Sequence, residues 1–367
     1  MAKAKYTRGK DGYFQAKVWD GTYKENGRKH YIPLRSKKSS KDLEDKVNEF
    51  NAKVKAREFT RKTDVTVYEY AKAWRLAYKP LREDNNNLNT VAMYNNIIEK
   101  HLKVLSCRWE DLTRAHILST LNSAKGDRSR QQILMTLKQI CKSAVKDKLL
   151  AKNIYDELLD DLDVKYKSPE KRPLTSYEKK ALFDAEFQLK DQALVYLLYG
   201  CGLRREEALA LTIFDFALNK KEVTINKAIA FDGNDPVLKD TKNYTHRTVP
   251  IPDNVFPTVQ AYIRSLHGTV LFHMSDGRYI TKSSYDKTWA RIIRTMQLKS
   301  NEPIVGLTAH IFRHNYCTAL CYQVPNISLA KIAELMGDTI EMVIKVYNHI
   351  MAEKEKPAEV VTSALAL

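Results

Sequence analysis

Five side chains in the C-terminal half of the sequence are of types that can handle a phosphate group. Arg204 follows the "GCGL" turn at a predicted helix start, and His310 and Arg313 lie three residues apart in "TAHIFRHNYCTAL". Lys242 lies in a polar stretch, and Tyr347 lies on the last strongly apolar helix. Arginines match phosphate oxygens, histidine and lysine move protons, and tyrosine can be a covalent nucleophile. The set predicts phosphoryl transfer with no metal and no other cofactor.

Each of these residues also has an ordinary structural interpretation. The spacing HxxR is common by chance, and a histidine on a helix usually has a structural role. Arg204 could instead be a salt-bridge partner between domains. Cys317 and Cys321, one helical turn apart, are predicted to be core residues. Residue types and spacing alone therefore leave the phosphate site and its alternatives open.

The part of the chain that must position these residues, 172–356, mixes helices with a few strands. Thr175 and Glu178 have the capping-box spacing that opens a helix. Residues 192–211 predict a helix, a turn with two glycines and a second helix, and two later stretches alternate as strands do. The strands are expected at 221–231 and 247–252, and further helices at 253–266, 283–297, 308–320, 328–337 and 339–350.

Two other domains are predicted upstream. Residues 1–60 predict two strands, at 13–20 and 28–36, followed by a helix at 39–54, whereas 64–160 predict only helices. Residues 160–172 are charged and lack an apolar period, which is typical of a linker. The predicted fold class is α+β in several domains, with a small antiparallel sheet in the last and a tail at 357–367 that could dock on another chain.

The charge of the chain favours a polyanionic partner. The formal net charge is +17, and residues 1–63 hold 18 lysines and arginines against 8 acidic residues. A basic surface that serves only solubility is the alternative. The candidate DNA contacts are Lys17, Lys29, Arg35, Lys138 and Lys142.

The cysteines and the apolar segments predict a protein of the cytoplasm. The five cysteines form no CxxC pair, which argues against a zinc site and against a disulfide scaffold. The N-terminal residues lack the apolar region of a signal peptide, and no apolar run approaches the length of a membrane span.

The segments around the candidate residues resemble the boxes of the tyrosine recombinase, or phage-type integrase, family, especially its conjugative-transposon members. "GLRREEALAL" (202–211) is similar to G-L-R-x-x-E-x-x-x-L, with the catalytic arginine at Arg204 and the acidic residue at Glu207. "HIFRH" is similar to H-x-x-R-H, with His310 and Arg313. "LMGDTIEMVIKVYNHI" (335–350) is similar to L-G-H followed nine residues later by the nucleophile, here Tyr347.

A fourth segment, "TKNYTHRTVPIP", resembles the strand turn that carries the catalytic lysine of this family. Lys242 fits that position most naturally, and Lys239 lies close enough in sequence to be an alternative. The resemblance implies a site-specific recombinase in which Tyr347 forms a 3′-phosphotyrosyl link and Lys242 protonates the leaving 5′-oxygen. It further implies that Arg204 and Arg313 hold the non-bridging oxygens and that His310 assists proton transfer.

The resemblance also implies binding partners and a separate role for each domain. Residues 1–60 would bind arm-type DNA sites, 64–160 the core site, and 172–356 would perform catalysis. A homo-tetramer would assemble on double-stranded DNA from a protein that is monomeric when free, with an excisionase and a DNA-bending host protein as candidate partners. The location would be the bacterial cytoplasm, in association with the nucleoid.

One residue departs from the family's pattern. Asp338 stands where the family usually has histidine and sometimes tryptophan. An ionised carboxylate donates no hydrogen bond and repels a phosphate, so Asp338 is expected to turn away and cap the next helix. Glu207 is expected to have a supporting role, in which it orients Arg204 or a neighbouring donor. His314 is expected to pack or to bond to backbone, and His349 to cap the helix of Tyr347.

Two other functions stay open at this point. A type IB topoisomerase-like enzyme would use the same chemistry on one duplex, and the separate N-terminal module speaks against it. A non-catalytic DNA-binding protein with this fold is the other alternative, and Asp338 is the residue that favours it.

Overall fold

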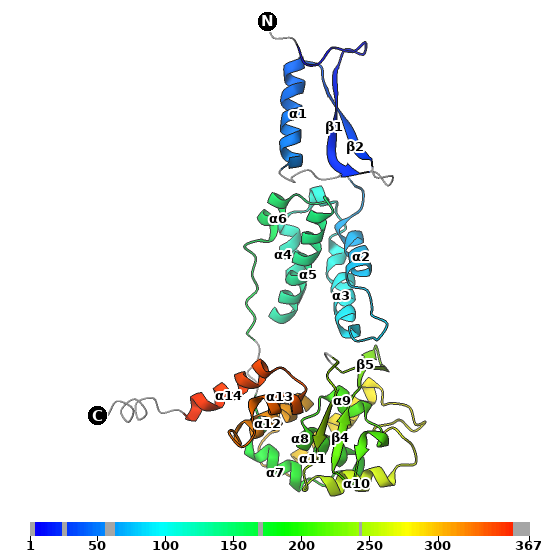
Figure 1. Cartoon of the computed structure of the whole chain (residues 1–367), viewed down its shortest axis with the longest axis vertical. Coiled ribbons are helices and arrows are strands. Elements are labelled where there is room, and N and C mark those ends of the chain that lie inside the picture. Colours follow the sequence, from blue (N-terminus) through cyan, green and yellow to red (C-terminus); the bar gives the residue numbers. More distant parts are fainter. Residues whose placement is uncertain (1–3, 24–27, 56–62, 168–171, 242–243, 355–367) are drawn as a thin grey trace, which may run out of the picture. The chain divides into compact units, whose positions relative to one another are not determined.

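The computed structural model describes residues 4–23, 28–55, 63–167, 172–241 and 244–354 (Figure 1). Contacts divide the chain into two compact units, residues 1–80 with 90–168, and residues 81–89 with 169–367. Helices and small antiparallel sheets occur together, which confirms the predicted α+β class. Within the described ranges, no helix is long and apolar enough to span a membrane.

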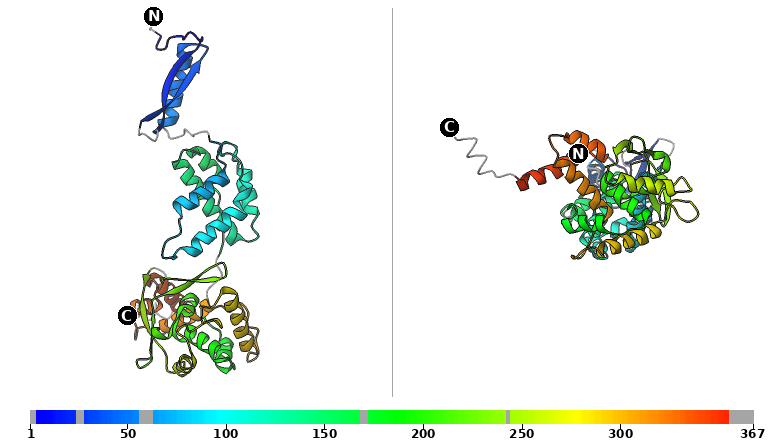
Figure 2. Two further views of the ribbon diagram at one scale, coloured as in Figure 1. Left: turned by 90° about the vertical axis from the view of Figure 1, so that its right-hand side faces the viewer. Right: turned by 90° about the horizontal axis from the view of Figure 1, so that it is seen from below.

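The N-terminal module is a two-stranded antiparallel sheet packed on one helix (Figures 1 and 2). Strand β1 (Phe14–Tyr23) pairs with β2 (Lys29–Ser36), and α1 (Ser40–Lys55) covers one face. Val18, Leu43 and Val47 form its small buried core. The predicted strands and helix are confirmed.

The opposite face of this sheet carries aromatic as well as basic side chains. Side chains alternate along a strand, so Gln15, Lys17 and Trp19 share the face turned away from α1, opposite Arg35, Pro33 and Tyr31. Lys29 Nζ lies 4.8 Å from the centre of the Trp19 ring. Trp19 and Tyr31 therefore lie on the face that does not pack on the helix. A two-stranded sheet with a single helix has only one apolar face to bury.

The helical part follows the prediction for 64–160. Its core contains four buried aromatic residues, Tyr70, Trp74, Tyr94 and Trp109. Trp74 Nε1 donates to Ser143 Oγ over 2.9 Å. Thr66 and Glu69 form a capping box at its first helix. The helices are α2 (Val67–Tyr78), α3 (Leu88–Lys100), α4 (Arg114–Asn122), α5 (Asp127–Lys146) and α6 (Lys152–Leu159).

The predicted linker after α6 is partly attached to this helical core. Leu162 and Val164 pack against it, Arg114 forms a bidentate pair with Asp161, and Lys138 Nζ donates to the Leu162 carbonyl over 2.8 Å. An irregular segment can be fixed in this way without showing an apolar period.

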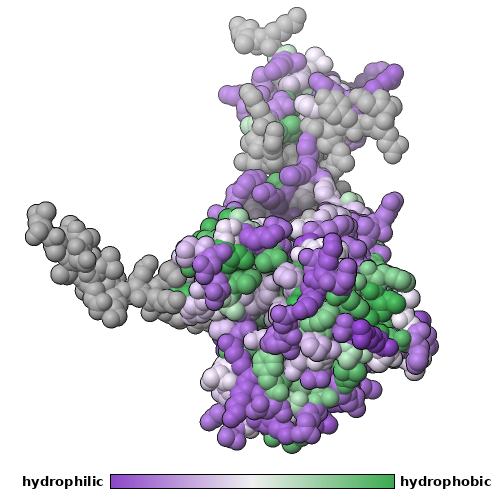
Figure 3. Space-filling view, turned by 60° about the horizontal axis from the view of Figure 1, so that its bottom comes forward, coloured by the Kyte–Doolittle hydropathy of each residue, from purple (hydrophilic) through white to green (hydrophobic). Residues whose placement is uncertain are grey.

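The remaining unit is built on an apolar core of helices that flank a three-stranded sheet of order β3-β4-β7. The predicted strand 221–231 is in fact two strands, β4 and β5, and β5 pairs with β6 in a separate hairpin. That hairpin occupies part of a stretch that we expected to be a connection. Figure 3 shows one face of the molecule, largely hydrophilic with apolar patches between.

The capping box of Thr175 and Glu178 is present at the first helix of this unit, as predicted. The helices are α7 (Ser176–Asp184), α8 (Leu189–Cys201), α9 (Arg205–Ala210), α10 (Phe256–Ser265), α11 (Lys282–Gln297), α12 (Ala309–Cys321), α13 (Leu329–Met336) and α14 (Ile340–Lys354). The strands are β3 (Phe216–Ala217), β4 (Glu222–Ile225), β5 (Ala228–Asp232), β6 (Asp235–Lys239) and β7 (Arg247–Pro250).

Candidate active site

Arg204 is positioned by a left-handed turn between two helices. Helix α8 ends at Cys201 and is capped by Gly202, whose φ of +60° suits glycine. A Cβ atom at Gly202 would lie 2.3 Å from the Tyr316 ring. The chain then re-enters a helix, with Arg204 at its N-cap. Arg204 Nη1 donates to Glu207 Oε1 over 2.8 Å, which is the contact expected for a residue that orients it.

Arg313 reaches the same place from α12, although its side chain is only 2% exposed. Its Nη1 donates to the Gly202 carbonyl over 2.9 Å, and its Nη2 donates to the Met336 carbonyl over 2.5 Å. Burial lowers the pKa of Arg313 to about 10, helped by the neighbouring positive charges, so the guanidinium is still charged at neutral pH.

Asp338 joins the two arginines, contrary to the expectation that it turns away. Its Oδ2 accepts from Arg204 Nη2 over 3.0 Å and from Arg313 Nη2 over 3.1 Å. Its Oδ1 accepts from the backbone N–H of Thr339, and α14 begins one residue later than an Asp338 cap would require. Two guanidiniums attract a carboxylate more strongly than one helix start does. Burial opposes ionisation, but the arginines hold the pKa of Asp338 below its usual range.

Arg247 is a site residue that the sequence analysis missed. It lies on β7 with its side chain 2% exposed, and it donates from Nη2 to Glu207 Oε2 over 2.6 Å and from Nε to the Leu335 carbonyl over 2.9 Å. Burial opposes ionisation of Glu207, yet the bonds and charge of Arg247 lower its pKa to about 2. A signal was available, because Arg247 has the same strand parity as the buried Val249 and Ile251. An arginine at an inward position needs a buried carboxylate.

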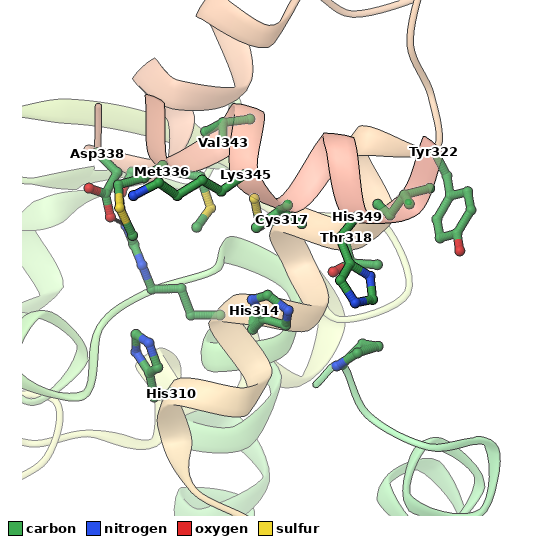
Figure 4. Close-up of a pocket in the computed structure, with 15 residues that line it drawn as sticks. His310, His314, Cys317, Thr318, Tyr322, Met336, Asp338, Val343, Lys345 and His349 are labelled. Carbon is green, nitrogen blue, oxygen red and sulfur yellow. Dashed lines mark hydrogen bonds and ion pairs between the residues drawn. The ribbon is translucent and has the colours of Figure 1, made fainter. Parts of the chain in front are cut away.

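A cavity of about 490 Å³ has Arg313 in its lining (Figure 4). His310 and Asp338 line one end of it, and Lys345 of α14 points toward that end. Apolar side chains form much of the rest of the cavity lining, which also includes His314 and His349. The lining further contains Pro173, Cys317, Thr318, Tyr322, Met336, Met342, Val343, Val346 and Ile350.

Tyr347 is on α14, as predicted. It is half-buried and packs on an apolar cluster that includes Cys317, Cys321 and Ile332. The described lining of the cavity includes its neighbours Val346 and His349 and does not include Tyr347. The predicted core role of the two cysteines is confirmed.

Other candidate residues lie in different surroundings. Lys242 falls outside the described residues, and Lys239 Nζ lies 3.4 Å from Asn86 Oδ1. Lys138 uses its ammonium on the Leu162 carbonyl and is half-buried, whereas Lys142 is exposed on α5. Lys17, Lys29 and Arg35 are all exposed.

Comparisons with known proteins agree with this geometry. Residues 173–354 match the profile of the phage integrase family. XerD of Vibrio cholerae, a tyrosine recombinase, is 24% identical over 290 residues, which cover 73% of this chain and 88% of that protein. XerA of Pyrococcus furiosus, also a tyrosine recombinase, is 26% identical over 190 residues, or 51% of this chain and 60% of that protein.

Solved structures of integrases have the same fold. The Tn1549 transposon integrase in complex with transposon right end DNA superposes with a TM-score of 0.64 at 20% identity, over 83% of this chain and all of that one. A lambda integrase tetramer bound to a Holliday junction gives a TM-score of 0.58 at 14% identity, over 92% of this chain and 93% of that one.

The fold is that of the solved integrases, and tyrosine recombinases are similar to the chain in sequence. Residues 173–354 of the chain carry a domain of the phage integrase family. Alignments of the chain cover 60% of XerA of Pyrococcus furiosus and 47% of a XerC-like recombinase of Caldanaerobacter subterraneus, so the chain spans about half the length of these relatives.

Proposed function

We propose that the protein is a site-specific DNA recombinase that cuts and rejoins DNA through a 3′-phosphotyrosyl intermediate. The observation that carries the proposal is the convergence of Arg204 and Arg313 on a single carboxylate oxygen. Two guanidiniums aimed at one point can hold a phosphodiester by its non-bridging oxygens. The phage integrase domain supports the same chemistry, and the DNA bound to the structural neighbours supports DNA as the substrate.

In the proposed reaction the Tyr347 hydroxyl attacks the scissile phosphorus. A bond forms between the Tyr347 oxygen and phosphorus while the bond to the 5′-oxygen breaks, and Lys242 protonates that oxygen. Arg204 and Arg313 stabilise the charge that develops, and His310 assists proton transfer at the edge of the cavity. Religation by a 5′-hydroxyl of another duplex reverses these steps.

The other parts of the chain would hold the DNA. We assign arm-site binding to the outer face of the N-terminal sheet, where Lys17, Lys29 and Arg35 lie beside Trp19 and Tyr31. The helical part would bind the core site, with Lys142 among its exposed cations. A homo-tetramer on DNA, an excisionase and a bending protein complete the proposal, together with a monomeric free state and a place at the nucleoid.

The test is covalent trapping on a nicked substrate that carries the core site found beside the encoding gene. We expect an SDS-stable protein–DNA adduct with the native protein and none with Tyr347→Phe, which keeps the ring and loses the nucleophile. DNA binding should be nearly unchanged in the variant, as measured by gel shift. An adduct that persists in Tyr347→Phe would show that another residue is the nucleophile.

The same experiment separates the two alternative functions. Absence of an adduct despite tight, site-specific binding would favour a non-catalytic DNA-binding protein. An adduct without exchange between two duplexes, together with relaxation of supercoiled DNA, would favour a topoisomerase-like enzyme.

A further inference from the structure

The position between the two arginines is filled by a carboxylate of the chain itself. Asp338 Oδ2 lies 3.0 Å from Arg204 Nη2 and 3.1 Å from Arg313 Nη2. Arg204 follows α8 and Arg313 belongs to α12, so two distant segments meet at one oxygen. Carboxylate and phosphate oxygens accept the same charged hydrogen bonds from guanidinium.

We infer that Asp338 is a resident anion in the phosphate position, and that a DNA phosphate binds Arg204 and Arg313 by displacing it. The inference rests on the proposed function, since it takes this site to be the one that binds the scissile phosphate. Asp338 thereby holds the site closed until a phosphate competes for the arginines.

The two arginines are fixed by groups that stay in place when Asp338 leaves. Arg204 is bonded to Glu207 and to the Gly337 carbonyl, and Arg313 is bonded to the carbonyls of Gly202 and Met336. Removal of the Asp338 carboxylate would therefore leave two oriented donors for another anion, without collapse of the guanidiniums.

Asp338 itself is held more loosely. Its side chain is 31% exposed, whereas the side chains of Arg313 and Glu207 are 2% and 1% exposed. Apart from the arginines, the bond from the Thr339 N–H is the contact that holds its carboxylate in the described structure. A rotation of the side chain toward solvent would release it.

The charge of the cluster also favours displacement. Arg204, Arg247 and Arg313 supply three positive charges, and Glu207 and Asp338 supply two negative ones. Glu207 is buried and bonded to Arg247, so Asp338 is the carboxylate that can leave. Its departure lets the cluster offer a second positive charge to the phosphate and to the charge that develops during cleavage.

The test uses the full-length protein and inorganic phosphate as the probe, without DNA. Phosphate affinity is measured by calorimetry at constant ionic strength in Asp338→Asn and in the native protein. We expect about tenfold tighter binding in Asp338→Asn, because two charge-assisted donors become available and a like charge is removed. Adding Arg204→Ala to Asp338→Asn should remove the gain.

The matched control is Glu334→Gln. Glu334 lies on α13, is 62% exposed and pairs with Lys331, so this variant changes the net charge equally without touching the arginines. Its phosphate affinity should equal that of the native protein. Asp338→Glu, which keeps the charge, should also bind like the native protein. Asp338→Ser provides a second neutral variant if the asparagine variant does not fold.

Equal or weaker phosphate binding in the neutral Asp338 variants overturns the inference, and so does an equal gain in Glu334→Gln. This outcome is distinct from failure of the proposed function. A Tyr347-dependent DNA adduct without the gain in phosphate affinity rejects the resident anion alone. The gain without any adduct supports the resident anion and rejects the recombinase.

Discussion

Replacement of Arg247 by methionine tests whether the buried charge network supports the site. Methionine keeps much of the length of the side chain but removes the guanidinium that bonds Glu207 and the Leu335 carbonyl. Glu207 would then keep Arg204 as its charged partner, within a site where its side chain is 1% exposed. The change therefore leaves a buried carboxylate undercompensated.

The expected loss is large for a single substitution. Removal of one partner from a buried ion pair costs about 3–5 kcal/mol, because the charge that stays behind has no water to solvate it. The Leu335 carbonyl also loses its donor, and an unsatisfied buried acceptor costs about 1–3 kcal/mol. The two losses overlap, since water can enter the space, so we expect about 3–5 kcal/mol in all.

Hydrogen exchange read by mass spectrometry suits this test, because peptides from α9 and β7 report on their own unit in a chain of several domains. A loss of about 3 kcal/mol corresponds to roughly 150-fold faster exchange where global opening limits it. The control is Arg278→Met, since Arg278 is 83% exposed and its pair with Asp276 should contribute less than about 1 kcal/mol. Exchange within tenfold of the native rate in Arg247→Met would refute the argument.

Three more outcomes follow from the structure. Gly337→Ala should destabilise by about 1–3 kcal/mol in the same exchange assay, because φ is +56° and a Cβ would lie 2.7 Å from Arg247 Nη1. Gly277→Ala, with a φ of +82° in open space, should lose less. Acid should destabilise α9, because the pKa of Glu207 is about 2 in the fold against an ordinary 4.5. Roughly 3 kcal/mol of stability, present above pH 4.5, should be lost as the pH falls toward 2. Glu207→Gln should lack this pH dependence. Lys17→Ala with Arg35→Ala should weaken binding of the protein to arm-site DNA and reduce its salt slope by about 2, as measured by footprinting across salt concentrations; an unchanged slope would contradict a DNA-facing sheet.

The sequence allowed the main elements to be predicted where local signals are strong. The capping box at Thr175 and the alternation in residues 13–20 and 28–36 each depend on neighbours in sequence, and each is present. Residues 221–231 were harder, because a run of strand formers does not show where a turn divides it. The β5–β6 hairpin even contains Pro236, a residue that weakens any strand prediction.

The site was predictable in its residue types and less so in its partners. The resemblance to the family's boxes placed Arg204, His310 and Arg313 in one site, but the direction of Asp338 depends on charges that are 134 and 25 residues away along the chain. The part of Arg247 likewise depends on Glu207, 40 residues away. Interactions between residues far apart in the sequence leave no local sequence pattern. The one hint of the role of Arg247 was its inward-facing position on the predicted strand.

Helix ends explain why arginine rather than lysine suits these positions. The last carbonyls of a helix lack partners and carry partial negative charge, which favours cations there. The end of α13 gives the carbonyls of Leu335, Met336 and Gly337 to three arginines, and the end of α8 gives that of Gly202 to Arg313.

Each guanidinium thus satisfies a helix end with some donors and keeps others for an anion. A lysine has a single ammonium at the end of a flexible stem and cannot hold a fixed orientation in this way. The bonds that close α8 and α13 therefore also orient Arg204 and Arg313 before any phosphate arrives. Such preorganisation is what stabilisation of a charged transition state requires.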